Sequence, residues 1–277
     1  MKKQSFFFSC LLLAAAVITL PACRKLDRLE DIFRDFDKYS GHCRITRIID
    51  SSASYGSGVT TATFKYNKAG DPVSILFDES GTGRPNYLFW YDQKGRISDY
   101  FEAYISEGVW HGCERWRHYV YQGNRIVQDT AWSFVNVINN VPQRGQIYEV
   151  TDYTYDQHDR ITKMVMTLKV GSQVYVASYI YAYNAQGNLS SMQRWEGSQL
   201  ASEYVYNSYD DKPAVHRTHK LWKFLARNYS VNNAFPALSY NQYKLPLGFH
   251  PVQHNVAEFN LLDKLPLNHS VISYQCK

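Results

Sequence analysis

One turn motif recurs along the chain and constrains the fold more than any other feature. Its fullest form is YDQKGRI at Tyr91–Ile97, and related stretches begin at Tyr66, Tyr155 and Tyr183. An Asp or Asn after the tyrosine, with Gly three residues later, is typical of a type I turn followed by a residue with positive φ. The Asp or Asn side chain can also accept hydrogen bonds from the turn backbone. Each copy therefore predicts a β-hairpin.

Three other stretches are weaker copies of the same motif. Tyr121–Asn124 is shortened to a Gly-Asn loop, and Tyr206–Asp210 is a degraded sixth copy. In a third, Asp159 takes the glycine place, which Asp tolerates better than most residues. Successive turn tyrosines are 23 to 34 residues apart. A period of this length indicates a repeat architecture in which each hairpin buries a face on the next.

A second aromatic residue lies two positions before each turn tyrosine. Because side chains alternate along a strand, both aromatics share one face. The predicted result is a cross-strand ladder with contacts of about 0.2–1 kcal/mol each. Its members are Phe64, Phe89, Tyr119, Tyr153, Tyr181 and Tyr204.

Turns of another kind alternate with these. Gly171-Ser172 and Gly197-Ser198 each lie between strand-like runs, and Gly-X is typical of a two-residue II′ loop. A long loop is expected near Asn139–Pro142. Two alternating kinds of turn predict an up-and-down meander.

Two helices are expected outside the hairpins. Residues 24–37 have apolar residues at spacings of three and four, and His219–Arg227 reads as a short helix. The predicted fold class is therefore all-β: a twisted antiparallel meander of repeated β-hairpins, with short N-terminal and C-terminal helices.

The first residues read as a targeting segment. Lys2 and Lys3 precede an apolar run at Phe6–Leu20, and Pro21-Ala22-Cys23 follows. This arrangement is typical of a secretory signal. The end of the run resembles the lipobox of bacterial lipoproteins, which implies cleavage before Cys23 and lipidation of that residue. The alternative is an ordinary signal peptide with Cys23 as a free thiol.

These boundaries divide the chain into three parts. Residues 1–22 are the expected lipoprotein signal peptide, 23–40 a lipid-anchored N-terminal helix or linker, and 41–277 a single YD-repeat-like β domain. Loss of two lysines with the signal lowers the formal net charge from +5 to +3. The sequence has no dense basic stripe, so nucleic acid is not an expected partner.

Three cysteines remain in the expected β domain. Cys43 opens the first strand-like run and Cys276 closes the last, so a disulfide between them would join the two ends of the fold. Cys43–Cys113 is the rival pairing, since spacing alone cannot decide connectivity. A disulfide or a buried thiol is favoured over a metal site. His216 and His219 are expected on the surface, and no metal or cofactor is predicted.

The turn motifs resemble the YD-repeat (RHS-type) hairpins of bacterial envelope and secreted proteins. The resemblance covers about residues 60–210 and is closest for small lipoproteins that carry a few repeats behind a lipobox. Large YD-repeat shells enclose a cargo and have many more copies, so that role is not implied for six. The resemblance implies no enzymatic activity.

The predicted function is a non-catalytic cell-envelope lipoprotein, a binding or scaffolding module that a lipid anchors in the bacterial cell envelope. Whether it lies on the outer membrane, and whether it faces the periplasm or the cell surface, stays open. A glycan or an envelope protein is the expected partner. The alternative is a surface glycan- or peptide-binding protein that uses an aromatic strip. Trp90, Trp116, Trp132 and Trp195 are the candidate stacking residues. A structural role in covering the sheet is the favoured interpretation of these rings.

Overall fold

A computed structural model describes residues 42–51, 58–81, 83–235, 237–249, 260–262 and 265–277. Within them, sixteen strands form one antiparallel sheet, and two short strands pair separately. The strands are β1 (Cys43–Asp50), β2 (Thr60–Tyr66), β3 (Pro72–Phe77), β4 (Asn86–Tyr91), β5 (Ile97–Ser106), β6 (Val109–Gln122), β7 (Arg125–Ile138), β8 (Val141–Gln143), β9 (Ile147–Tyr155), β10 (Ile161–Val170), β11 (Gln173–Tyr183), β12 (Leu189–Glu196), β13 (Gln199–Val205), β14 (Ala237–Tyr240), β15 (Pro246–Phe249), β16 (Asn260–Leu262), β17 (Leu265–Pro266) and β18 (Ser270–Cys276).

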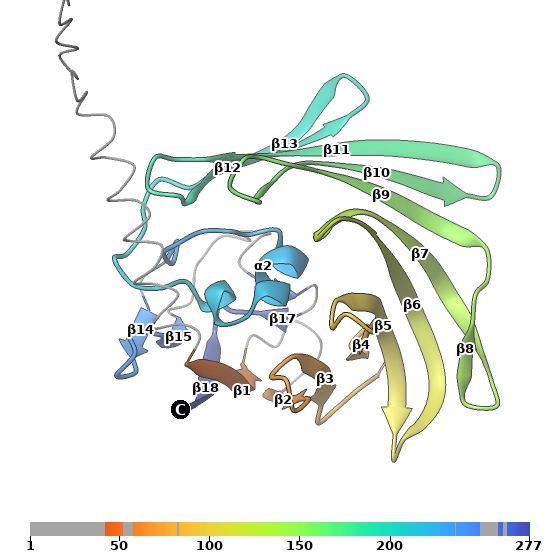
Figure 1. The fold of residues 1–277 in the computed structure, drawn as a ribbon, viewed down its shortest axis with the longest axis horizontal. Coiled ribbons are helices and arrows are strands. Elements are labelled where there is room, and N and C mark those ends of the chain that lie inside the picture. Colours follow the sequence, from red (N-terminus) through yellow and green to blue (C-terminus); the bar gives the residue numbers. More distant parts are fainter. Residues whose placement is uncertain (1–41, 52–57, 82, 236, 250–259, 263–264) are drawn as a thin grey trace, which may run out of the picture.

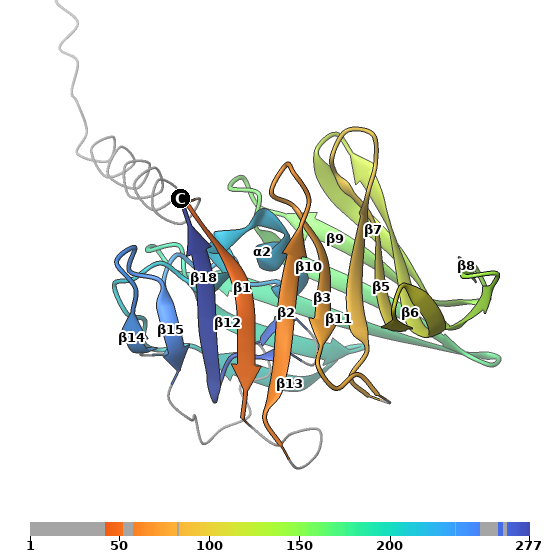
Figure 2. The same cartoon turned by 90° about the horizontal axis from the view of Figure 1, so that it is seen from below.

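The strands form a meander, and the last strand of the chain returns to pair with the first. Strands β1 to β13 are neighbours in chain order, except that β8 pairs only with β7 and β9 takes its place beside β7. The last strand, β18, pairs with β1 and extends the sheet through β15 to β14. The sheet curves, and its concave side faces the C-terminal part of the chain (Figures 1 and 2).

The predicted pair of flanking helices is wrong for the described chain. Its one α-helix is α2 (Lys220–Ala226), preceded by the 3₁₀ turn η1 (Val215–Thr218). The expected helix at residues 24–37 lies outside the described residues. Helix α2 also lies inside the curve of the sheet rather than beside it (Figure 1). The reason is that its three large apolar side chains, Leu221, Trp222 and Phe224, cover the apolar concave face.

The YD turns have the predicted geometry. Between β4 and β5, Asp92 Oδ1 accepts hydrogen bonds from the backbone N–H groups of Lys94 and Arg96, both at 2.9 Å. Gly95 has φ 71°, and Asp159 adopts φ 59° at the equivalent place. Each turn is therefore closed by its acid or amide and by one residue in the left-handed region.

The tyrosine of each motif has a structural function that turn chemistry does not explain. Its hydroxyl donates to the backbone carbonyl of a residue one hairpin earlier in the chain, so consecutive repeats are tied together. The five links are Tyr66 to Ile45 (2.7 Å), Tyr91 to Pro72 (2.6 Å), Tyr121 to Ile97 (2.9 Å), Tyr155 to Ile126 (2.8 Å) and Tyr183 to Ile161 (3.2 Å).

The arginine of the motif strengthens these links. Arg96 pairs with Asp92 of its own turn at 2.8 Å, and its guanidinium lies 4.1 Å from the ring centroid of Tyr121 in the next repeat. Arg160 repeats the arrangement, with its guanidinium 4.2 Å from the Tyr183 ring. Such cation–π contacts are worth about 0.5–1 kcal/mol at exposed sites.

The series of links extends beyond the predicted repeats. Tyr209, rather than Tyr206 of the degraded sixth copy, donates to the Leu189 carbonyl. An unpredicted seventh turn joins β14 to β15, where Asn241 Oδ1 accepts from the N–H groups two and four residues later and Lys244 has φ 63°. Sequence inspection missed it because Lys244 replaces the glycine.

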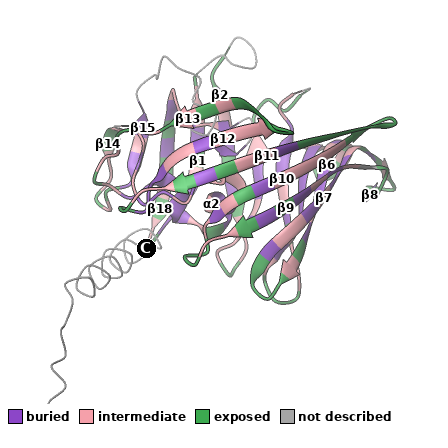
Figure 3. Cartoon of the chain, turned by 90° about the horizontal axis from the view of Figure 1, so that it is seen from above, coloured by how far each residue is buried: buried purple, intermediate pink, exposed green. Residues whose placement is uncertain are grey.

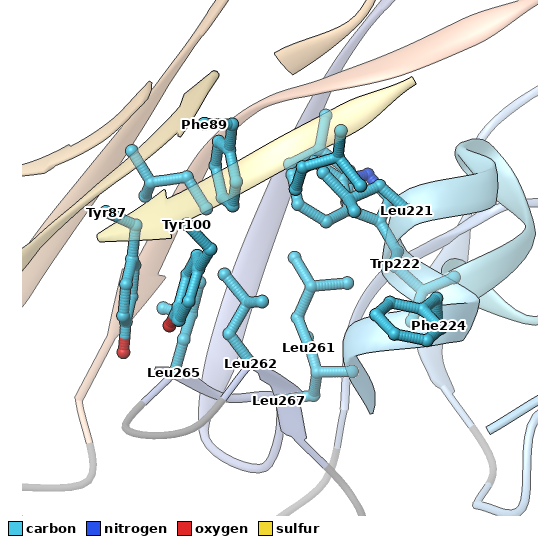
Figure 4. Close-up of a cluster of buried hydrophobic side chains, with 14 of the residues drawn as sticks. Tyr87, Phe89, Tyr100, Leu221, Trp222, Phe224, Leu261, Leu262, Leu265 and Leu267 are labelled. Carbon is cyan, nitrogen blue, oxygen red and sulfur yellow. The ribbon is translucent and has the colours of Figure 1, made fainter. Parts of the chain in front are cut away.

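Five of the six ladder aromatics are buried in the main core, and Tyr204 is half-buried against it. Phe89 lies 5.9 Å from Trp222, and Tyr119 and Tyr153 lie 5.5 and 5.3 Å from Phe224, between ring centroids. Figure 4 shows the side chains of α2 and the C-terminal leucines facing Phe89 across this core. The favoured structural interpretation of the ladder therefore holds for these rings.

The strand ends opposite the YD turns are joined by tight turns. This edge of the sheet extends past the core. Gly171 and Gly197 have φ 61° and 59° in the two predicted Gly-Ser loops. The loop expected near Asn139–Pro142 is instead a hairpin between β7 and β8, turned by Asn139 and Asn140 at φ 52° and 65°. Asn tolerates this backbone conformation better than most residues. The ends of β10 and β11 are largely exposed (Figure 3).

A disulfide joins Cys43 to Cys276, the pairing that the sequence favours over Cys43–Cys113. The two residues are opposite each other on β1 and β18, and 233 residues separate them along the chain. By the chain-entropy model a crosslink of that span stabilises the fold by about 5 kcal/mol.

His216 and His219 are not on the surface as expected. His216 is 2% exposed and its Nε2 lies 2.9 Å from the Asn260 carbonyl oxygen. His219 Nδ1 accepts from the Leu221 N–H at the start of α2, and its Nε2 lies 3.4 Å from Asp71. Burial lowers the pKa of each imidazole to about 4.

We expect the tyrosine links to carry measurable stability. Tyr121→Phe removes one hydroxyl and leaves the Ile97 carbonyl without its donor, which should cost about 1–2 kcal/mol of unfolding free energy. Urea denaturation measures the change. The control is Tyr175→Phe, because Tyr175 is 52% exposed on β11 and lies outside the links. Equal effects of the two variants would show that the links do not stabilise the fold.

We also expect stability to fall in mild acid. The folded-state pKa of His216, about 4, is below its unfolded value of about 6.5, so protons favour the unfolded chain between these values. The contribution is complete above pH 6.5, and about 2–3 kcal/mol should be lost by pH 4.5. His216→Gln should make the urea-derived free energy less dependent on pH across this range. An unchanged slope in that variant would contradict the assignment.

Candidate functional site

Two cavities lie on the concave side of the sheet, and Phe224 of α2 lines both. We call them the central cavity and the turn-side cavity. The central cavity has a volume of about 370 Å³ and lies between strands β5 to β11 and the end of α2. The turn-side cavity has a volume of about 620 Å³ and lies beside the YD turns. Both volumes fall in the range of about 300–1,000 Å³ that is usual for ligand pockets.

A buried charge triad lies at one wall of the central cavity, where two of its members, Arg117 and Glu149, line the cavity. Arg117 Nη1 on β6 lies 2.7 Å from Asp129 Oδ1 on β7 and 2.7 Å from Glu149 Oε1 on β9. The three residues are 8%, 0% and 5% exposed. Tyr153 donates its hydroxyl to the second oxygen of Asp129. The sheet brings these groups together because they occupy inward positions on three adjacent strands.

Glu149 and Arg117 of the triad are charged at neutral pH. Burial alone would raise the pKa of the Glu149 carboxyl, but the adjacent Arg117 guanidinium outweighs it and holds this pKa below its usual value. Glu149 is therefore ionised across the physiological range. A permanently ionised, ion-paired carboxylate can bind or orient a ligand, but it cannot serve as a general acid at neutral pH.

A second acid–arginine pair lines the same cavity. Glu102, on β5, is 2% exposed, lies 3.7 Å from Arg115 and accepts a hydrogen bond from the Tyr100 hydroxyl at 3.3 Å. Tyr179 and Tyr181 add ring surface from β11. The central cavity thus combines cations, anions, hydroxyls and aromatic faces, which suits a compact polar ligand.

The turn-side cavity has a cationic rim and an aromatic wall. Arg96, Arg125, Lys220 and Lys223 line it, with Asp159 as the acid in the lining. Arg96 and Arg125 are already ion-paired with Asp92 and Asp159, respectively. The lining tyrosines include three whose hydroxyls form the links between repeats. Many polar groups that line this cavity are therefore already used in contacts that stabilise the fold.

The four candidate tryptophans do not form one exposed strip. Trp116 and Trp132 are 8% and 6% exposed, and their rings are 5.3 Å apart in a second cluster on the other face of the sheet. The Arg144 guanidinium lies 5.0 Å from each ring. Trp90 contacts this cluster through Phe101 at 4.5 Å and is 45% exposed. Trp195, on β12, instead donates to Gln193 at 3.2 Å.

The remaining candidate groups are outside the cavities or outside the described chain. Cys23 lies outside the described residues. Cys113 is a buried free thiol, and burial raises its pKa to about 12, so it is not a nucleophile at neutral pH. The described part of the chain holds no group of three or more His, Cys, Asp or Glu suited to a metal ion. None of its helices has the length and apolar character needed to span a bilayer.

Sequence inspection missed the residues of the central cavity. Asp129 and Glu149 lie within strands that otherwise alternate apolar and polar residues, so each looks like an ordinary solvent-facing position. For Glu149 the available signal was parity, because it lies four positions before Tyr153 and so shares the face of that inward tyrosine. Asp129 had no such signal. It lies an odd number of positions after the inward Ile126, and an irregularity in the pairing of β6 with β7 brings it to the same face.

Comparisons with known proteins leave the family open. No family model matches the chain, and no curated protein does so. Among solved structures, the chain is similar to the TcdB2-TccC3 complex at 12% identity and a TM-score of 0.18, over 54% of this chain and 10% of that one. It is also similar to a mutant of S. aureus TarM in complex with Fondaparinux, alpha-GlcNAc-glycerol and UDP, at 9% identity and a TM-score of 0.20, over 66% of this chain and 31% of that one. The chain therefore spans about a tenth to a third of these neighbours, and similarity this low carries no functional argument.

Proposed function

We propose that the protein is a non-catalytic lipoprotein of the bacterial cell envelope whose concave face binds a ligand. One observation supports the binding part: charged and hydroxyl groups from four strands, β5, β6, β9 and β11, converge on the central cavity. Pockets of this kind, mostly preformed and with a few converging polar groups, are the usual sites of small-molecule binding.

The chemistry of the cavity supports binding over catalysis. Arg117 keeps Glu149 ionised, and Glu102 contacts Arg115 and the Tyr100 hydroxyl. A general acid at neutral pH needs a carboxyl with a raised pKa, and a nucleophile needs an adjacent base. In these groups the charges are instead paired with each other.

The alternative is a surface that binds glycan or peptide through the tryptophan cluster. Its support is Trp90, which is 45% exposed at the margin of the rings of Phe101 and Trp110. Burial of Trp116 and Trp132 leaves less ring surface than an extended sugar chain would require. The central cavity is therefore the preferred site.

Lipidation at Cys23 anchors the protein in this proposal. Buried acyl chains contribute about 0.8 kcal/mol per CH₂, so several chains hold a protein firmly on a membrane. We expect the wild type, and a Cys113→Ala control, to partition into detergent and to incorporate a labelled fatty acid. Cys23→Ser should lose both properties. A Cys23→Ser protein that keeps its label and stays in the membrane fraction would refute the anchor.

Glycan and peptide arrays probed with the soluble 24–277 fragment test the binding part. We expect a small number of related ligands, whose binding is lost in Glu102→Gln, at the central cavity, and kept in Trp90→Ala. The reverse pattern would favour the tryptophan surface. If the wild-type fragment binds no ligand on either array, the result would contradict ligand binding.

A further inference from the structure

Arg227 occupies a backbone position that disfavours arginine. It follows the last residue of α2 with φ 53° and ψ 28°, and its N–H donates to carbonyls of the final turn. Glycine is the usual residue at this place, because a Cβ is unfavourable in the left-handed region. An arginine in this unfavourable conformation suggests that its side chain has a function.

The Arg227 side chain lines the central cavity. Its Nε lies 3.2 Å from Met164 Sδ, and its Nη1 donates to the Leu225 carbonyl at 3.1 Å. Both acceptors are neutral, and a thioether sulfur is a weak acceptor. Among the residues that the structure describes, no carboxylate lies within ion-pair distance of this guanidinium.

The other arginines of the cavity differ from Arg227 in this respect. Arg117 has two carboxylates at 2.7 Å, and Arg115 has Glu102 at 3.7 Å. A guanidinium has five N–H donors in a planar fork that matches a carboxylate. Arg227 uses two of them on neutral protein atoms. Its positive charge, unlike that of Arg115 and Arg117, is therefore not paired with a carboxylate of the described residues, and it keeps N–H donors for a ligand.

We propose that Arg227 is the anchor for the carboxylate of a compact polar ligand in the central cavity. This inference rests on the proposed binding function and names its ligand class. A volume of about 370 Å³ suits one or two sugar rings or a single amino acid. Tyr179 and Tyr181 offer ring surface to the body of such a ligand, and the neighbouring carboxylates of Glu102 and Glu149 disfavour a multiply charged anion.

The carboxylate could come from a sugar acid or from an amino acid. Titration calorimetry of the full chain in detergent, with matched probes, distinguishes the two. The acids are glucuronate and N-acetylalanine, and their neutral counterparts are glucose and N-acetylalanine amide. We expect one acid to bind and its neutral counterpart to bind at least about tenfold more weakly, which is the effect of losing one charge-assisted hydrogen-bond pair.

Two substitutions at Arg227 and one matched control locate the contact. Arg227→Gly relieves the backbone conformation, so we expect an unfolding midpoint equal to or a few degrees above that of the wild type. We also expect its binding of the acid to fall at least about tenfold. Lys244→Gly makes the same backbone change at φ 63° on the β14–β15 turn, and it should leave binding unchanged. Arg227→Lys should also weaken binding, because an ammonium cannot form both bonds of the fork.

Several outcomes would overturn the assignment. These are the absence of binding by both acids, equal affinity for an acid and its neutral counterpart, undiminished binding in Arg227→Lys, and an equal loss in Lys244→Gly. If Arg227→Gly does not fold, acid binding by Arg227→Lys tests the assignment instead. An uncharged ligand found on the arrays would defeat the Arg227 assignment and leave the proposed binding function standing.

Discussion

The hydrogen bond from each turn tyrosine to the preceding hairpin is the interaction on which the rest of the structure depends. A two-stranded hairpin is at best marginally stable in water, and a long sheet of hairpins needs contacts that join one to the next. The ladder of backbone hydrogen bonds supplies some of these. The tyrosines of five YD turns add a link, such as Tyr121 to Ile97, and place a ring at the edge of the concave face. The Arg96 guanidinium stacks on the Tyr121 ring and adds a cation–π contact to the link.

A curved sheet leaves a concave apolar face that must be covered. The chain covers it with its own C-terminal part, in which Trp222 and Phe224 of α2 pack on the inward aromatics of β2, β4, β6 and β9. The chain then returns to the sheet as β18 beside β1, where the disulfide joins the two ends. A short helix cannot fill the whole curve, and the two cavities are the space that it leaves.

The buried charges of the central cavity are not explained by stability alone. Removing a carboxylate and a guanidinium from water costs several kcal/mol per ion, and well-packed apolar residues are often at least as stabilising. Arg117 and Glu149 nonetheless lie together at the wall of a cavity, and Asp129 pairs with the same guanidinium. Their retention is better understood as a preorganised polar surface, fixed by the same sheet that the tyrosine links hold in register.

The sequence by itself determined the local structure. The spacing of Asp92 and Gly95 defines a turn within four residues, the aromatics two positions earlier share its face, and Cys43 and Cys276 stand at the two ends of the β domain. These features are local or tied to the ends of the pattern, so they need no knowledge of the fold. Only the tertiary structure decided that α2 lies inside the curve, that His216 is buried, and that Arg117, Glu149 and Arg227 meet in one cavity. Those outcomes depend on the curvature and register of the whole sheet, and single positions along the chain do not encode either one.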